Sequence, residues 1–456
     1  MTENTALEKI NSERASVIFT ELYGKDQTDA ARRRYSSLIT EMNKLPEAEL
    51  CNTDGNLRIF TSPGRTELGG NHTDHNRGKV LAASIQLDNA AVTQKRSDNV
   101  VFFRSSGFPD VKVLLTDKNG NPDLEPKQKE RGTTEALIRG IAAEFYKRGC
   151  PAGGFSANAE STVLPGSGLS SSAALEVLIG KIFDSLYGEG KITAKTAGAL
   201  EIAQIGQFAE NQYFGKPCGL MDQTACAAGG AVSIDFADAA NPAVKRINFN
   251  LDSAGYVLCV INTGGSHADL TADYASIPAE MKAVASFFGK SALREIDKEN
   301  VLGSARDIRK ALGDRALLRA IHFFDENARV DAMAASLQEM DTASSSVLKK
   351  KTLLQYLNNV NESGDSSWEL LQNVFSPNFP ENQRISAALA LTKDFFRSHK
   401  LHGACRVHGG GFAGTIQVYL PKDALNAYRK YIESIFGGGA LTPLRIRPVG
   451  AVELFN

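Results

Sequence analysis

The sequence has no excess of charge of either sign. Its 51 Lys and Arg residues almost balance 52 Asp and Glu residues, which leaves a formal net charge of −1. Proteins that coat nucleic acid or an anionic membrane usually carry a basic excess. We therefore expect neither nucleic acid nor a membrane as a partner, and nothing in the sequence implies an obligate protein partner.

Long apolar runs are also missing. A transmembrane helix needs about 20 mostly apolar residues, and no segment of the sequence provides them. The N-terminal stretch MTENTALEKINSERAS mixes charges of both signs and has no apolar signal core. Both observations predict a cytoplasmic protein.

Cysteines are few and scattered. The six are Cys51, Cys150, Cys218, Cys226, Cys259 and Cys405. They form no CxxC pair and none of the close spacings that are typical of small disulfide scaffolds or zinc clusters. We expect reduced thiols and no zinc site.

The pattern of elements predicts an α+β fold with two lobes. The 456 residues are 42% hydrophobic and 23% charged, as in globular proteins of two or three domains. Strand and helix patterns are mixed in the first half, whereas helical patterns dominate from about residue 270 to residue 400. We expect a helical extension of two stretches over residues 1–46, one lobe over 47–240 and a second lobe over 241–456.

A glycine- and serine-rich segment gives the clearest local signal. A predicted strand ends at Val163 and a predicted helix begins at Ser170, with Gly166 and Gly168 between them. The glycines permit close backbone approach, and the free N–H groups of the first helical turn favour an anion. No Lys follows the last glycine, so this is not a Walker A loop. A serine-capped helix after a turn fits the same residues.

A second polar segment covers residues 62–78 and is predicted to be a loop between two strands. It is polar or Gly everywhere except at Pro63 and Leu68. Such a density of directional donors and acceptors is what sugar binding needs, although a solvated loop is also polar. His72 and His75 resemble metal ligands, but no further Cys or His cluster completes a site.

A third segment, Glu210–Gln223, carries two carboxylates of interest. Glu210 falls in the last turns of a helical pattern, where an acid opposes the helix dipole, and this placement suggests a cation ligand. A solvated surface acid is the alternative. Asp222 follows Gly-Leu-Met and is expected in an apolar loop bounded by glycine, where a turn or capping acid is the alternative.

Together with residues 403–414, these three segments resemble motifs of the GHMP kinases, and those of the galactokinases most closely. Residues 64–78 are similar to GRVNLIGEHTDYNGG, and 164–173 to the phosphate loop PxGxGLSSSA. Residues 209–223 are similar to AEH…GxPCGxMDQ, and 403–414 to GARMTGGGFGG. One motif would be weak evidence, but four in family order are strong.

The resemblance implies a fold and a reaction. The N-terminal lobe would be like ribosomal protein S5 domain 2 and the C-terminal lobe would be ferredoxin-like, with MgATP and sugar meeting between them. Phosphate would pass from ATP to the anomeric hydroxyl of α-D-galactose, which gives galactose 1-phosphate and ADP.

The resemblance also assigns roles residue by residue. Asp222 would accept the proton of the anomeric hydroxyl, while Arg65 would keep Asp222 ionised and stabilise charge at the attacking oxygen. Ser171 and Glu210 would bind Mg²⁺. The expected sugar contacts are Asn71, His72, Asp74, Gly219 and Tyr274. The expected phosphate-binding residues are Pro165, Gly166, Ser167, Gly168, Leu169, Ser170, Ser171, Ser172 and Ala173.

The sequence departs from the family pattern at the substrate end. The family carboxylate that binds a hydroxyl far from the anomeric carbon is Asn71 here, and Glu67 stands where the pattern has Asn. A sugar altered at C6, such as galacturonate, is therefore an alternative, although the other sugar positions favour galactose. The intact phosphate loop and Asp222 argue against a non-catalytic galactose sensor. The His-Thr-Asp and Cys-Gly-Leu-Met-Asp segments argue against a mevalonate or homoserine kinase.

Overall fold

The larger of two sheets is built on two long antiparallel strands, β1 (Asn52–Gly69) and β2 (Lys79–Arg96). The computed structural model describes residues 1–50, 52–163, 168–192, 198–265 and 270–455. The strand order is β12-β1-β2-β5-β3-β4, and β6 pairs with β2 and β7. The other strands are β3 (Val100–Ser105), β4 (Val111–Leu114), β5 (Phe155–Ser161), β6 (Ala231–Asp235), β7 (Ala243–Ile247) and β12 (Val452–Leu454).

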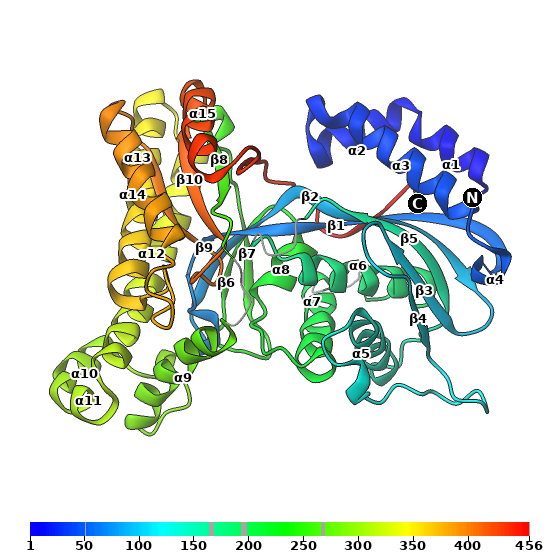
Figure 1. The fold of residues 1–456 in the computed structure, drawn as a ribbon, viewed down its shortest axis with the longest axis horizontal. Coiled ribbons are helices and arrows are strands. Elements are labelled where there is room, and N and C mark those ends of the chain that lie inside the picture. The colour runs from blue at the N-terminus through cyan, green and yellow to red at the C-terminus, as the bar shows by residue number, and fades with distance from the viewer. Residues whose placement is uncertain (51, 164–167, 193–197, 266–269, 456) are drawn as a thin grey trace.

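Helices cover both faces of this sheet (Figure 1). Because successive strand residues point to opposite faces, Phe60 and Ala91 pack into one core while Ile59 and Val92 pack into another. The first core lies under α5 (Thr134–Lys147), α6 (Ser171–Leu186) and α7 (Gly198–Ala209), and α8 (Met221–Ala228) packs on the same face. The second core lies under the N-terminal helices.

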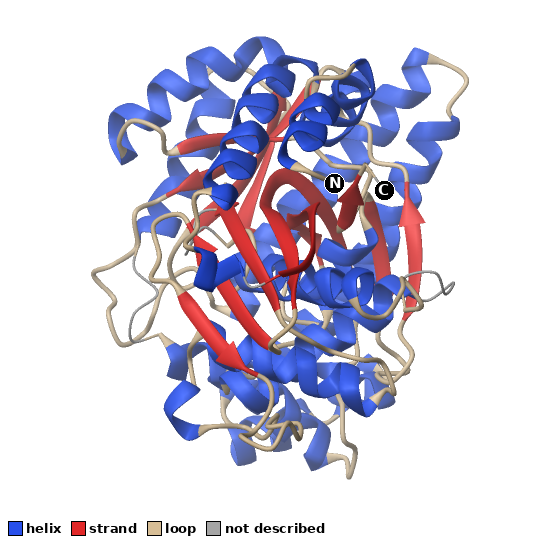
Figure 2. Ribbon diagram, turned by 90° about the vertical axis from the view of Figure 1, so that its right-hand side faces the viewer, coloured by secondary structure: helices blue, strands red, loops and turns tan. Residues whose placement is uncertain are grey.

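The N-terminal extension contains three helices where the sequence predicted two helical stretches. They are α1 (Glu3–Ile10), α2 (Glu13–Tyr23) and α3 (Thr28–Asn43), and the short α4 (Glu47–Leu50) follows. The first predicted stretch is divided because the Ser12 side chain accepts a hydrogen bond from the Ala15 N–H and begins a new helix there. The chain ends meet on this side of the molecule, where Lys9 Nζ donates to the Phe455 carbonyl at 3.1 Å (Figure 2).

The second sheet has the order β11-β8-β10-β9 and is also layered. Cys259 and Ile261 face one core, whereas Leu258 and Val260 face another that includes Leu81 of the first sheet and so joins the two lobes. The strands are β8 (Tyr256–Asn262), β9 (Ala404–His408), β10 (Thr415–Pro421) and β11 (Leu441–Leu444). The helices are α9 (Thr271–Phe287), α10 (Lys298–Gly303), α11 (Ala305–Leu312), α12 (Asp314–Thr342), α13 (Ser346–Ser366), α14 (Arg384–Ser398) and α15 (Leu425–Phe436).

The α+β class is confirmed, and two boundaries differ from expectation. Residue 240, the predicted end of the first lobe, falls between β6 and β7 of the same sheet, and β12 returns to pair with β1. The predicted loop over residues 62–78 is a strand as far as Gly69, with register shifts at 63–65 and 67–69. Bulges of this kind re-aim side chains at the end of a strand. None of the described helices is long and apolar enough to span a bilayer.

Candidate active site

An arginine and an aspartate from different elements form the centre of the site. Arg65 lies on β1, and Asp222 lies in the first turn of α8 rather than in the predicted loop. The Arg65 Nε and Nη2 atoms donate to the two oxygens of Asp222, each at 2.8 Å. A bidentate pair of this kind fixes the geometry as well as the charge. The structure therefore brings the two predicted catalytic residues together.

The Asp222 carboxyl is held in its ionised form. Burial alone would raise its pKa, but the charge and hydrogen bonds of Arg65 and the hydroxyl of Ser170 keep the pKa below its ordinary value. Ser170 Oγ donates to Asp222 Oδ2 at 2.5 Å. An ionised carboxylate with one hydroxyl already bound to it is suited to accept a proton from a second hydroxyl.

The described part of the phosphate loop is hydrogen-bonded to Arg65. Gly168 has φ +70° and Ser170 has φ +61°, and α6 begins at Ser171. The Gly168 carbonyl accepts a hydrogen bond from Arg65 Nη1, and the Leu169 carbonyl accepts one from the Arg65 N–H at 3.1 Å. Ala173, in the first turn of α6, is buried. Three predicted phosphate-binding residues, Pro165, Gly166 and Ser167, lie outside the described residues.

Glu210 is buried at the same place, with 3% of its side chain exposed, so it is not a solvated surface acid. It begins a π-helical turn, Glu210–Phe214, that follows α7. Its Oε1 accepts hydrogen bonds from Ser172 Oγ at 3.2 Å and Lys216 Nζ at 3.1 Å, and its Oε2 accepts one from Gln223 Nε2 at 3.0 Å. The serine that meets Glu210 is thus Ser172, and the geometry favours it over Ser171 as the partner of Glu210.

Sequence reasoning missed a second buried carboxyl beside Glu210. Gln223 Nε2 also donates to Glu176 Oε2 at 2.9 Å. Burial, and then the charge of Glu210, raise the pKa of Glu176 well above its ordinary value. Burial and the neighbouring carboxylate thus favour the protonated form of Glu176. Glu176 lies four residues after Ser172 on α6, and this helical spacing is the signal that could have found it.

Two of the predicted sugar residues, Asp74 and Gly219, lie against each other just before α8, and a third, His72, contacts the second lobe. A Cβ atom on Gly219 would lie 1.7 Å from Asp74 Oδ2, so only glycine allows that carboxylate to approach the loop before α8. His72 Nε2 bonds the Gly410 carbonyl at 3.0 Å, while its Nδ1 is buried and has no partner among the described residues. Burial lowers the pKa of His72 to about 3, so the ring is neutral and Nδ1 is a free acceptor.

The glycine loop of the second lobe, residues 409–411, contacts three of the predicted sugar residues. Its carbonyls at positions 409, 410 and 411 accept hydrogen bonds from Asn71 Nδ2 at 2.7 Å, from His72, and from the Tyr274 hydroxyl at 2.9 Å. Each of these three predicted sugar contacts therefore holds the loop in this structure. Tyr274 also packs edge-on against Phe412 and directly beneath Gly410.

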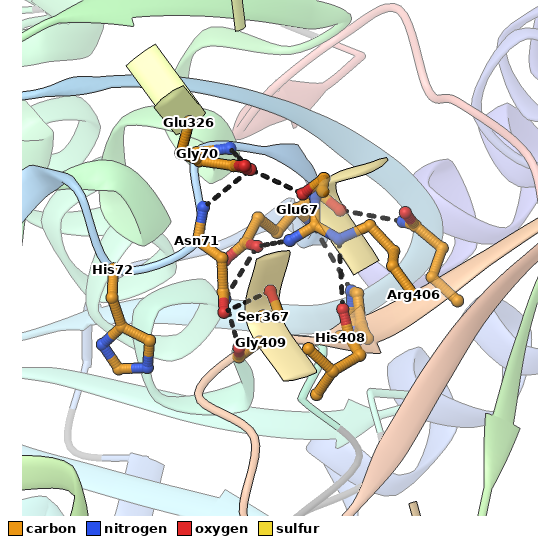
Figure 3. Close-up of polar contacts among 12 residues, drawn as sticks. Glu67, Gly70, Asn71, His72, Glu326, Ser367, Arg406, His408 and Gly409 are labelled. Atoms are coloured by element: carbon orange, nitrogen blue, oxygen red, sulfur yellow. Dashed lines mark hydrogen bonds and ion pairs between the residues drawn. The ribbon is translucent and has the colours of Figure 1, made fainter. Parts of the chain in front are cut away.

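Asn71 differs from its expected role, because its side chain is fully engaged inside the protein (Figure 3). Besides Gly409, its Nδ2 donates to Glu67 Oε1 at 3.0 Å, and its Oδ1 accepts a hydrogen bond from Asn373 Nδ2 at 2.8 Å. No part of the residue is exposed. An amide with these partners has no free group for the far end of a sugar. In this structure Asn71 therefore positions its neighbours and does not make the expected direct contact.

Glu67, the partner of Asn71, is the carboxylate in this part of the motif. Its Oε1 accepts from Arg406 Nη2, and both side chains are buried, with 2% and 0% exposed. Glu67 lies on β1 of the first lobe and Arg406 lies on β9 of the second (Figure 3). The amide and the carboxylate have thus exchanged positions relative to the family pattern, and the charge now bridges the two lobes.

Comparisons with known proteins point to the same family as the sequence motifs. The signature "Galactokinase galactose-binding signature" matches residues 49–95, and "GHMP kinases N terminal domain" matches residues 136–230. A galactokinase of Glaesserella parasuis is 30% identical over 380 residues, which is 81% of this chain and 87% of that protein. A galactokinase of Streptomyces coelicolor is 29% identical over 85% of this chain and 91% of that protein.

Solved structures show the same fold. The Lactococcus lactis galactokinase complexed with galactose has a TM-score of 0.72 at 23% identity and covers 92% of this chain and 100% of that one. The Methanococcus jannaschii mevalonate kinase has a TM-score of 0.55 at 13% identity over 86% of this chain and 99% of that one. The structural likeness includes a mevalonate kinase as well as a galactokinase, whereas the relatives near 30% identity and the galactose-binding signature are those of galactokinases. The chain belongs to the galactokinase family of GHMP kinases.

Proposed function

We propose that this chain is a galactose 1-kinase that transfers the terminal phosphoryl group of ATP to the anomeric hydroxyl of galactose. The observation that carries the proposal is the bidentate Arg65–Asp222 pair at the end of the phosphate loop. Asp222 accepts the hydroxyl proton, and Arg65 stabilises the negative charge that develops on the attacking oxygen. The enzyme acts on small molecules in the cytoplasm and needs no protein partner.

The oxygen ligands next to Asp222 fit Mg²⁺, the metal ion that the family uses. Glu210 and Ser172 present a buried carboxylate and a hydroxyl to the same point, and Mg²⁺ usually takes one or two carboxylates together with substrate phosphates. When bound, Mg²⁺ would neutralise charge on the transferring phosphoryl group. The N-terminal turn of α6 orients the phosphates through its N–H groups and serines.

The sugar is held by the residues around Asp222. The carboxylate of Asp74 and the free Nδ1 of His72 are acceptors for sugar hydroxyls. Arg77 and Lys79, the two cations available to balance a substrate carboxylate in this segment, are already paired: Arg77 contacts Glu295 at 3.3 Å and Lys79 contacts Asp331 at 2.6 Å. The pairing favours galactose over galacturonate.

A coupled assay of ADP release tests the substrate. Galactose, galacturonate, glucose and mevalonate are compared at equal concentration, and the sugar product is identified by ³¹P NMR. We expect kcat/KM for galactose to exceed that for each alternative by at least about 10-fold, because a site built to bond a hydroxyl rejects analogues that change it. Preference for galacturonate would overturn the choice of sugar, and absence of turnover with all four would overturn the kinase itself.

We expect Glu210→Gln and Ser172→Ala each to raise the Mg²⁺ concentration needed for half-maximal activity by at least roughly 10-fold, because even the loss of a group that supports a metal ligand costs about that much. Ser171→Ala is the matched control, because Ser171 has the same side chain one position away and no contact with Glu210. Titration of Mg²⁺ at fixed ATP measures the shift. If Ser171→Ala moves the midpoint and Ser172→Ala does not, Ser171 is the ligand.

A further inference from the structure

Lys216 is a cation that the family motif does not specify, since it occupies the variable position of GxPCG. Its backbone folds back over Glu210, because the N–H groups of Gly215 and Lys216 donate to the Glu210 carbonyl at 2.9 and 3.2 Å. Gly215 makes this turn at φ +87°, in the left-handed region that glycine favours. The ammonium then reaches the Glu210 side chain at 3.1 Å.

The Lys216 ammonium donates to the Glu210 oxygen that a metal ion would need. Glu210 Oε1 is bonded by both Lys216 and Ser172, whereas Oε2 is fixed by Gln223. A divalent ion between Glu210 and Ser172 therefore competes with the ammonium for Oε1. The Glu210 carboxylate is almost fully buried, but 61% of the Lys216 side chain is exposed. The lysine can thus leave without losing much buried surface.

The charges of the site give the released ammonium a destination. Arg65 is held by two hydrogen bonds to Asp222. Among the described residues of this cluster, the Lys216 ammonium is held by one hydrogen bond, to Glu210. The phosphates of ATP would lie at the N-terminal turn of α6, where Ser172 stands. These phosphates would add negative charge next to Ser172, and an ammonium displaced from Glu210 would be attracted to it.

We propose that Lys216 is a catalytic residue that neutralises Glu210 in the free enzyme and moves to the transferring phosphoryl group when MgATP binds. The proposal rests on the proposed function. Under this proposal Lys216 has opposite effects on the affinities for the metal ion and for the nucleotide. The ammonium opposes metal binding in the absence of nucleotide, and it strengthens nucleotide binding once the metal ion is present.

Two binding measurements on the full chain, without sugar, test this assignment. Free Mn²⁺ is followed by electron paramagnetic resonance in nucleotide-free enzyme, and affinity for the ATP analogue AMPPNP is measured by calorimetry at saturating Mn²⁺. For Lys216→Met we expect Mn²⁺ to bind roughly two- to fivefold more tightly, which is the effect of losing an ion pair whose lysine is exposed to solvent. We expect AMPPNP to bind about 10-fold more weakly, which is the effect of a lost charge-assisted hydrogen bond.

Opposite shifts distinguish the proposal from loss of fold, which would weaken both ligands. Lys44→Met is the matched control, because Lys44 is 63% exposed and paired with Glu41 on the N-terminal extension. Lys216→Arg keeps the charge and should retain most of the AMPPNP affinity. Unchanged Mn²⁺ binding or unchanged AMPPNP binding in Lys216→Met overturns the proposal. Because no sugar is present, this result does not depend on whether galactose is the acceptor.

Discussion

Asp222→Asn is expected to lower kcat by roughly 10²- to 10⁴-fold, the contribution of a positioned general base. An amide keeps the shape of the carboxylate but cannot take the hydroxyl proton, and it can accept only one of the two Arg65 hydrogen bonds. Galactose and AMPPNP should bind within a few-fold of the wild-type affinities, since the lost interaction forms with the reacting atoms. Single-turnover ADP formation and calorimetry measure the two effects separately.

Asp235→Asn is the control for this variant, because Asp235 is an acid on β6 that pairs with Arg294 at 2.9 Å away from the Arg65–Asp222 pair. Its kcat should match that of the wild type. If Asp222→Asn retains wild-type kcat while folded and able to bind both ligands, Asp222 is not the base.

The pH dependence of the wild type follows from the same pair. The pKa of Asp222 is lowered in the folded protein, so the carboxylate stays ionised until the pH falls through that lowered value. We expect no acid limb from Asp222 in kcat/KM above about pH 4, the ordinary range of an aspartate. A profile of kcat/KM between pH 4.5 and 8 checks this, and an Asp222-dependent loss near pH 6 would contradict it.

The sequence motifs predicted which segments meet at the candidate site, because their residues come from short segments with fixed local geometry. Gly64 shows the reason: a Cβ atom there would lie 2.7 Å from the Leu169 carbonyl, so the signature and the phosphate loop can meet only through glycine. The strand continuing to Gly69 was missed because polar residues and glycines hide its alternation. The β2 partner and the two register shifts supply what the pattern lacks.

Other features depend on distant residues and could not be read from a local pattern. Glu67 and Arg406 are 339 positions apart, and only the packing of the two lobes brings them together. Lys216 follows a glycine and precedes a proline, which is typical of a surface turn. The choice between Ser171 and Ser172 depends on the helical phase of α6, which the start at Ser171 sets.

The exchange of amide and carboxylate between positions 67 and 71 predicts that each single reversal is strongly destabilising and that the double reversal is not. Asn71→Glu places a second carboxylate where Nδ2 now lies 3.0 Å from Glu67, with no exposure to water. Burial already raises the pKa of Glu67 even with Arg406 beside it, so two ionised carboxylates cannot share the site. Glu67→Asn leaves the buried charge of Arg406 without its partner.

We expect each single variant to lower the free energy of unfolding by about 3–5 kcal/mol, the usual cost of an uncompensated buried charge. Glu67→Asn combined with Asn71→Glu restores one carboxylate, one amide and the charge for Arg406, so it should recover at least about 2 kcal/mol relative to the sum of the singles. Urea unfolding of the four proteins gives this coupling energy. Asp110→Asn, which breaks the exposed pair with Arg104, should cost less than about 1 kcal/mol. Additive single effects would show that Glu67 and Asn71 act independently, and the positioning role of Asn71 would then fail.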